Sequence, residues 1–244
     1  MQPTIDPFFE VVTMAATPLP QQLTWAAMHQ CYSENAVAHE AASFPPDDIA
    51  GARVVKHLLS GNRGHYGPLE HATITVNVIG FPHSLMQQIT RHRLLSFDVQ
   101  SGRYTGARVC LVDQGEIDVN EVFYSRPAGV YVNREGKRYE WTLDDRLSDR
   151  AFFLERAHDY AAMIARGISE EHARERLPYA VRQDFVMSGN IRSLMHLLDM
   201  RWKKDAQQEA QWFAELLFSH FADWCSEIAG WYQQHRAHKA RLSP

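Results

Sequence analysis

The segment at 71–80, HATITVNVIG, most constrains the fold, because apolar and polar side chains alternate along it. Apolar residues stand at every second position from Ala72 to Val78, and threonines and an asparagine separate them. This period of two is typical of a strand with one buried face. Gly80 ends the segment, and Pro82 is suited to the first turn of a helix. The pattern therefore predicts a half-buried strand that leads into a helix.

Other segments predict a mixture of helices and one more strand. Capping residues support two of the helices, with Ser169 and Asn190 as N-caps. Helices are predicted at 19–33, 47–61 (ending at Gly61), 82–95, 145–167, 169–177 and 190–201, and a strand at 179–189. A long helix then carries an apolar stripe from Phe213 to Trp231, which suits a core or an oligomer interface.

The remaining segments predict a loop at 96–106 and a hairpin-like excursion at 122–143. The chain has 244 residues and contains no repeat or composition break. We therefore expect a single domain over 1–244, interrupted by the excursion at 122–143.

Composition excludes several classes of protein. The net charge of −4 argues against a general nucleic-acid binder, and no apolar run approaches the roughly 20 residues of a membrane span. The N-terminus does not resemble a secretory signal, and three scattered cysteines fit a reducing cytoplasm. No metal site is expected, because the histidines lack ligand spacing and His92 stands between two arginines that would repel a cation.

Residues 91–104, RHRLLSFDVQSGRY, concentrate positive charge in an acidic chain. Arg91 and Arg93, taken alone, are explained by a helix C-terminus whose carbonyls and dipole they would satisfy. Ser101, Gly102 and Arg103 add a hydroxyl, an open backbone and a guanidinium fork, which together suit a phosphate. The segment therefore predicts two anion-binding arrangements and, with them, nucleotide binding.

The order R-H-R, serine, G-R-Y resembles the motif of the flavin-dependent thymidylate synthases. Further segments are similar to that family in the same order along the chain. They are GHYGPLEHATITV (64–76), Gln88, RERLP (174–178), NIRSLMHLLDMR (190–201) and DAQQE (205–209). The resemblance runs from about residue 61 to 231, and the first 60 residues and the 122–143 excursion contribute less to it.

The resemblance implies a fold and a reaction. The fold is α+β, a mixed or antiparallel sheet flanked by long helices, in a homotetramer whose active sites form between subunits. The reaction is the methylation of dUMP at C5 to give dTMP. Methylenetetrahydrofolate supplies the carbon, FAD mediates hydride transfer and NADPH reduces the flavin. Such a route needs no cysteine nucleophile, and none of the cysteines lies in a matching motif.

The same resemblance implies roles for individual residues. Arg91 and Arg201 are the expected catalytic residues, with Arg201 stabilising negative charge on the uracil ring. Residues expected to bind dUMP are Gln88, Arg91, Ser101, Gly102, Arg103, Arg174 and Arg201. Residues expected to bind FAD are His65, Glu70, Arg91, His92, Arg93, Asn190, Arg192 and His196. Ser101 is expected as a ligand of the phosphate or ring, since no histidine base is evident beside it.

Departures from the family pattern leave alternatives open. Asp98 and Val99 stand where the family commonly has Asn-Glu, His196 where it has asparagine, and Asp205 where it has histidine. Without the glutamate, the loop would depend on backbone groups, Asp98 or Gln100, and we expect dUMP to remain the preferred substrate. The alternatives are a UMP/dUMP methylase of nucleoside-antibiotic synthesis and a non-catalytic, nucleotide-binding oligomeric protein.

Overall fold

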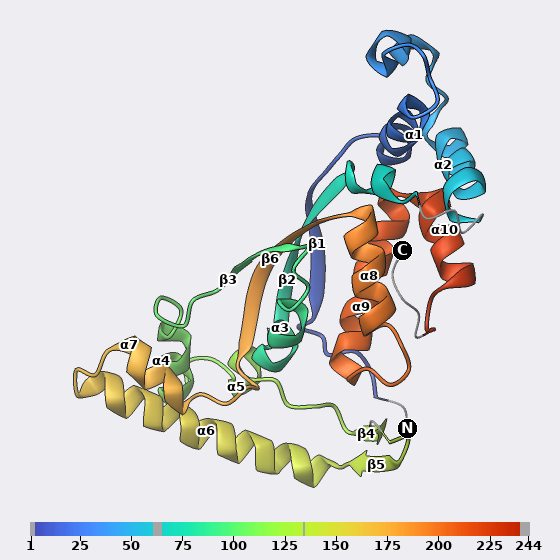
Figure 1. Cartoon of the computed structure of the whole chain (residues 1–244). Coiled ribbons are helices and arrows are strands. Elements are labelled where there is room, and N and C mark those ends of the chain that lie inside the picture. The colour runs from blue at the N-terminus through green and yellow to red at the C-terminus, as the bar shows by residue number, and fades with distance from the viewer. Residues whose placement is uncertain (1–2, 61–64, 134, 240–244) are drawn as a thin grey trace. The chain divides into compact units, whose positions relative to one another are not determined.

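The computed structural model describes residues 3–60, 65–133 and 135–239, and its fold is α+β, as the resemblance implied (Figure 1). The larger sheet has four strands in the order β1-β2-β6-β3, and the smaller one is the antiparallel pair β4–β5. The strands are β1 (Glu10–Ala16), β2 (Thr73–Pro82), β3 (Ser96–Val99), β4 (Gly129–Val132), β5 (Arg138–Trp141) and β6 (Arg182–Asn190).

Helices make up most of the rest of the described chain. They are α1 (Pro20–Gln30), α2 (Asp47–Val54), α3 (His83–Ile89), α4 (Ala107–Asp113), α5 (Val119–Val122), α6 (Leu143–Ala165), α7 (Glu170–Ala173), α8 (Ile191–Arg201), α9 (Gln208–Trp224) and α10 (Ser226–His235). Shorter helical turns are η1 (Val37–Ser43), η2 (Val55–Leu59), η3 (Gly67–Glu70) and η4 (Arg174–Arg176). Among the described residues, no helix combines the length and the apolar character needed to span a membrane.

The alternation at 72–78 is confirmed, because its apolar residues are buried and the polar ones between them are not. Ile74, Val76 and Val78 are each at most 2% exposed. Strand β6 alternates in the same way, with Phe185 and Met187 buried. Both strands are interior members of the sheet, and each leads directly into a helix, β2 into α3 and β6 into α8.

By internal packing the chain forms two compact units. Unit 1 consists of the described residues of 1–10, 78–91 and 97–186, and unit 2 of those of 11–77, 92–96 and 187–244. The expectation of a single domain over 1–244 stays a prediction.

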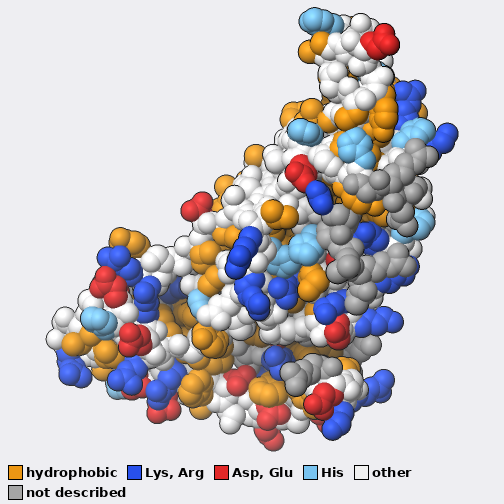
Figure 2. All heavy atoms as spheres, viewed as in Figure 1, with side chains coloured by type: hydrophobic (Ala, Val, Ile, Leu, Met, Phe, Trp, Pro, Cys, Tyr) orange, Lys and Arg blue, Asp and Glu red, His pale blue; other side chains and the backbone are white. Residues whose placement is uncertain are grey.

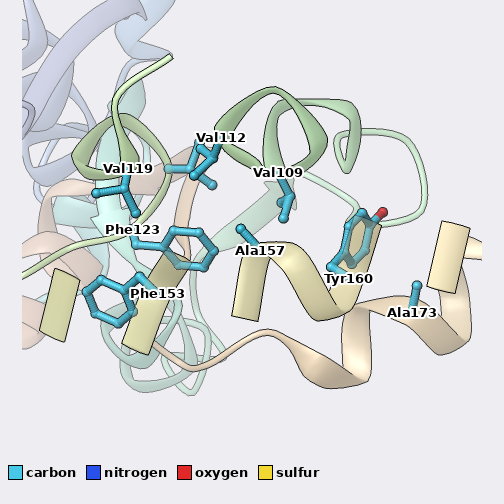
Figure 3. Close-up of a cluster of buried hydrophobic side chains, with 9 residues drawn as sticks. Val109, Val112, Val119, Phe123, Phe153, Ala157, Tyr160 and Ala173 are labelled. Atoms are coloured by element: carbon cyan, nitrogen blue, oxygen red, sulfur yellow. The ribbon is translucent and has the colours of Figure 1, made fainter. Parts of the chain in front are cut away.

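The core of unit 1 lies where α4 packs on α6 (Figure 3). Figure 3 shows side chains from α4, α5, α6 and α7 meeting in one apolar cluster. Its members include Val109, Val112, Val119, Phe123, Phe153, Ala157, Tyr160 and Ala173. Helix α6 begins at a capping box in which Thr142 and Asp145 bind each other's backbone N–H groups. This core supports the segment that precedes α4, which carries the predicted nucleotide loop.

The core of unit 2 is formed by α8, α9 and α10, which pack against one another in sequence. Leu194 and Leu198 of α8, and Phe213 and Phe221 of α9, are fully buried. The predicted continuous helix after residue 201 is wrong, because Cys225, with φ −142° and ψ 58°, separates α9 from α10. The apolar periodicity continues across this break, so the spacing of side chains alone did not reveal it.

The predictions for the segments 82–106 and 122–143 were partly correct. The hairpin expected within 122–143 is present as β4–β5, but it covers only 129–141, since α5 ends at Val122 and α6 begins at Leu143. Gly136 in its turn has a φ of 80°, a conformation that favours glycine. The predicted helix at 82–95 ends at Ile89, and the predicted loop at 96–106 begins with β3. Those two predictions were wrong in extent because α3 and β3 are short, at 7 and 4 residues, and carry too little periodicity to mark their ends.

The N-terminal half of the chain holds elements that the sequence did not predict. Strand β1 and helices α4 and α5 are among them. The helix expected at 47–61 is present as α2 and η2, while its expected terminator, Gly61, lies outside the described residues, as does Gly64 of the 64–76 motif.

Candidate active site

The predicted nucleotide loop of unit 1 is a tight turn built on Ser101. The carbonyl of Ser101 accepts hydrogen bonds from the backbone N–H groups of Tyr104 at 2.9 Å and Thr105 at 3.2 Å. The hydroxyl of Ser101 accepts a longer bond, at 3.4 Å, from the N–H of Arg103. Gly102 therefore lies at the tip of a turn whose ends are closed by the chain itself.

A pocket of about 550 Å³ opens beside this turn, entirely within unit 1. Two predicted dUMP residues, Gly102 and Arg174, lie in its wall. A Cβ added to Gly102 would lie 3.4 Å from Cδ of Arg174, so the two residues are in close contact. His83, Tyr179 and Gln183 also line the pocket and supply rings and an amide. The volume is in the range of small-molecule sites.

Arg108, on α4, is a second cation in this pocket that the sequence did not point out. Its Nη2 donates to the backbone carbonyl of Arg182, and its Nε is buried without a hydrogen-bond partner among the described residues. Burial lowers the pKa of Arg108, and the nearby Asp184 carboxylate opposes that shift. Because arginine stays protonated in proteins, Arg108 adds a poorly solvated positive charge beside Arg174. No motif marked it, since α4 itself was not predicted.

Arg103 faces α7 rather than this pocket. Its Nη2 lies 3.0 Å from a carboxylate oxygen of Glu171, and its guanidinium lies over the ring of Tyr104, 5.6 Å from the centroid. Both members of the ion pair are partly exposed, at 51% and 43%. Gln88, on α3, donates from Nε2 to the carbonyl of Ser84 at 3.3 Å. Arg91 is exposed, and it is the last residue of the 78–91 segment of unit 1.

Unit 2 brings together three of the other predicted residues. His92 is only 7% exposed, and its Nε2 accepts a hydrogen bond of 3.0 Å from Nε of Arg201, the last residue of α8. This bond fixes the tautomer of a neutral His92 with its proton on Nδ1. The ring of His196 lies edge-on to that of His92, with centroids 5.4 Å apart. Nδ1 of His196 is buried and has no hydrogen-bond partner within the described chain.

A second group of predicted flavin residues lies around the start of α8. Asn190 caps the helix by accepting a bond of 2.8 Å from the N–H of Ser193. Arg192 pairs with Glu70 of η3 at 2.6 Å, which joins two residues that are 122 positions apart in sequence. Arg93 is exposed, as is His65, whose Nε2 lies 3.8 Å from Sγ of Cys31.

The part of the chain that the structure describes contains no group of histidine, cysteine, aspartate or glutamate residues arranged to hold a metal ion. On the face drawn in Figure 2, basic and acidic side chains intermix over α6 and α7 and form no uniform basic surface. Within unit 1, the positive charge of the candidate nucleotide pocket comes from Arg108 and Arg174.

Solved structures with similar folds include two nucleotide-binding enzymes. A UMP/dUMP methylase PolB from Streptomyces cacaoi, bound with 5-Br dUMP, has a TM-score of 0.75 at 21% identity and covers 100% of both chains. Thymidylate Synthase X from Helicobacter pylori, with FAD and dUMP, has a TM-score of 0.63 at 21% identity and covers 94% of this chain and 97% of its own. Identities this low establish the similarity of the fold alone.

Comparison of sequences gives the family. A flavin-dependent thymidylate synthase of Haloarcula marismortui is 33% identical over 250 residues, covering 96% of this chain and 100% of the relative. That of Halobacterium salinarum is 38% identical over 199 residues, covering 79% and 80%. The family model described as Thymidylate synthase complementing protein matches residues 13–227. The chain therefore belongs to the family of thymidylate synthase complementing proteins, together with these flavin-dependent thymidylate synthases.

Proposed function

We propose that this protein methylates dUMP at C5 to form dTMP, with methylenetetrahydrofolate as carbon donor, NADPH as reductant and FAD as bound cofactor. The observation that carries the proposal is the pocket of unit 1, in which Gly102 of the family's loop motif meets Arg174 of a second motif. Glycine admits a ligand close to the backbone, and the two arginines Arg108 and Arg174 suit a nucleotide phosphate.

The phosphate is held by unit 1 residues in this proposal. Arg174 and Arg108 neutralise it, and Gly102 and Ser101 offer backbone and hydroxyl donors. The other members of the predicted dUMP set are Gln88, Arg91, Arg103 and Arg201. Arg91 and Arg201 are the proposed catalytic residues. The Nε of Arg201 donates to His92, and this bond helps to orient the guanidinium before the substrate arrives.

The residues proposed for FAD fit an anionic, aromatic cofactor. They combine cations with hydrogen-bonding rings. Nδ1 of His196 is buried with no hydrogen-bond partner among the described residues, so a ligand could satisfy it. The set consists of His65, Glu70, Arg91, His92, Arg93, Asn190, Arg192 and His196. When bound, FAD supplies the redox chemistry, and the protein residues orient it and the nucleotide.

The test of the proposed function is an omission series. The FAD-reconstituted protein is incubated with dUMP, methylenetetrahydrofolate and NADPH, and each component is left out in turn while dTMP is quantified. We expect dTMP only in the complete mixture and none when FMN replaces FAD. Failure to form dTMP in the complete mixture with folded, FAD-loaded protein contradicts the proposal and favours a non-catalytic nucleotide-binding protein.

A UMP/dUMP methylase is the second candidate, because the loop carries Val99 where the family commonly has glutamate. Loss of one polar contact costs about 0.5–1.5 kcal/mol, which is too little to abolish binding. We therefore expect kcat/KM to remain higher for dUMP than for UMP, and Val99→Glu to raise that preference. A native preference for UMP supports the second candidate, and an equal response of both substrates excludes Val99 from ribose selection.

Arg103→Ala should weaken dUMP binding about 10- to 100-fold, as expected for loss of a charge-assisted contact to phosphate. To reach a phosphate, Arg103 must first leave Glu171. Glu171→Gln is the matched variant and should tighten binding by at most about 5-fold, because a partly exposed ion pair contributes about 0–1 kcal/mol. Calorimetric titration measures both affinities, and an Arg103→Ala protein with native affinity removes Arg103 from the phosphate site.

Replacing all three cysteines by serine or alanine should leave dTMP formation within about 3-fold of the native rate, since the proposed chemistry needs no thiol. Burial raises the pKa of Cys110, and that of Cys225 well above its ordinary value, so both disfavour a thiolate. Cys31 is exposed and lies beside His65, so replacing it is the strictest test of a mechanism without a thiol. A folded, FAD-loaded triple variant without activity contradicts the mechanism, and the single Cys31→Ala variant then shows which thiol is responsible.

The assembly is also part of the proposal. We expect a homotetramer, supported by the exposed apolar side chains of Leu143, Leu147 and Phe152 on α6. Light scattering of the purified protein tests this, and a monomer of 28.0 kDa contradicts it.

A further inference from the structure

Gln100, directly before the nucleotide turn, is bound through every one of its polar groups to two adjacent residues of β6. Its Nε2 donates to Oδ2 of Asp184 at 3.0 Å, and its Oε1 accepts from the N–H of Asp184 at 3.2 Å. Its backbone N–H donates to the carbonyl of Asp184 at 3.0 Å, and its carbonyl accepts from Nε2 of Gln183 at 3.2 Å. The peptide that joins Gln100 to Ser101 therefore has a fixed position on β6.

The two β6 residues are themselves held by neighbours in unit 1. Oδ1 of Asp184 accepts a bond of 2.8 Å from the N–H of Gly80, at the end of β2. Oε1 of Gln183 lies 2.5 Å from Nδ1 of His83, whose ring stacks on Tyr179 at a centroid distance of 5.5 Å. Since Nε2 of Gln183 is engaged as a donor to Gln100, its oxygen accepts the proton on Nδ1 of His83. The network thus links the turn to β2, α3 and the wall of the pocket.

Gln100 anchors the loop in this network, and it is the residue next to Val99, where the chain departs from the family pattern. Val99 has no side-chain hydrogen-bonding group, whereas Gln100 uses both of its side-chain polar atoms. A loop fixed in advance loses less conformational entropy when a ligand binds. The carboxylate of Asp184 also acts electrostatically on Arg108 in the same pocket.

We propose that Gln100 and Asp184 are positioning residues, which hold the Ser101–Gly102–Arg103 turn in the geometry that binds the substrate's phosphate. The inference rests on the proposed function, since it assigns the turn to the nucleotide. It attributes the order of the loop in this chain to a pair of side chains 84 positions apart in sequence.

The donor and acceptor pattern allows an exchange experiment. In Asp184→Asn, either orientation of the new amide sets its NH₂ group against another donor, Nε2 of Gln100 or the N–H of Gly80. In Gln100→Glu, two carboxylates face each other. In the double variant Gln100→Glu/Asp184→Asn, the introduced glutamate and asparagine form the reverse pair. The NH₂ group of the amide then donates to the carboxylate, and its oxygen is free to accept from Gly80. Native protein and double variant each contain one carboxylate and one amide here.

Each single variant should raise both the Kd and the KM for dUMP at least 10-fold, with kcat and FAD content within about 2-fold of native. The double variant should return both constants to within about 3-fold of native. Gln100→Met removes the side-chain hydrogen bonds without adding a like charge, and it should raise Kd and KM as the single variants do. It replaces them in the experiment if they fail to fold. The matched control is Asp48→Asn, which makes the same change of charge at an exposed aspartate in the first turn of α2, and it should leave Kd unchanged.

Unchanged dUMP affinity in folded single variants overturns the inference, as does a folded double variant as weak as the singles. A structural role alone would lower thermal stability without the reciprocal rescue of Kd. Direct binding of dUMP is measured by equilibrium dialysis, separately from turnover. Native protein that neither binds nor methylates dUMP therefore refutes the proposed function, whereas native binding with insensitive variants refutes only the role of Gln100 and Asp184.

Discussion

Arg201→Ala should lower kcat for dTMP formation about 100- to 1,000-fold, the cost of removing one preoriented group that stabilises developing negative charge. Arg201 is half-buried at the end of α8, and its Nε donates a hydrogen bond to His92, which helps to orient the guanidinium. Charge on the uracil ring grows during methylation, so the effect should fall on kcat more than on the affinity for dUMP.

Single-turnover kinetics of the reduced, FAD-loaded protein measures this effect without interference from cofactor reduction. Arg201→Lys keeps the charge but loses the planar fork and the bond to His92, and it should recover only part of the rate. His92→Gln tests the orienting bond and should lower the rate less than Arg201→Ala. A rate for Arg201→Ala within a few-fold of native, at saturating dUMP, contradicts the catalytic role.

Arg182→Met should destabilise the protein by about 3–5 kcal/mol, because it leaves a buried carboxylate without its partner. Arg182 is 2% exposed, and its Nη2 lies 3.0 Å from Oδ2 of Asp6, which is 7% exposed. Its guanidinium also donates to the carbonyls of Gly80 at 2.6 Å and Asn120 at 2.8 Å. One side chain therefore satisfies groups from three separate segments of unit 1.

Urea denaturation of native protein and variants gives the loss of stability. Arg150→Met is the matched control, since Arg150 pairs with Asp118 at the same distance of 3.0 Å but with both side chains partly exposed. That control should cost no more than about 1 kcal/mol. The double variant Asp6→Leu/Arg182→Met removes the unpaired charge and should recover part of the loss. Equal costs for Arg182→Met and Arg150→Met contradict the assigned role of the buried pair.

The elements that the sequence predicted well are those whose periodicity follows burial over a whole segment. β2 alternates because one face is buried, and α8 begins directly after Asn190 because that side chain caps it. Short elements were missed or misplaced. α4 has 7 residues and β3 has 4, so their identity depends on packing against distant segments rather than on local pattern.

At the candidate site, too, some residues were predicted from the sequence, while others depend on tertiary packing. The family resemblance pointed to Gly102 and Arg174, which the structure brings into contact, and to Glu70 and Arg192, which it pairs. The sequence had no means of locating Arg108, because its importance comes from lining the pocket of Gly102 and Arg174. The partners of Gln100 on β6 and of Arg103 on α7 could not be predicted from the sequence either, since such pairings depend on the tertiary fold.

In the proposed reaction, FAD-dependent methylation of dUMP occurs on this protein without an enzyme thiol. Its most direct test is a single anaerobic turnover of the reduced, FAD-loaded triple-cysteine variant with dUMP and methylenetetrahydrofolate, with the nucleotide identified by mass spectrometry. We predict dTMP in an amount equal to the flavin that becomes oxidised. Recovery of unchanged dUMP from folded, reduced variant, under conditions in which native protein forms dTMP, would contradict the account.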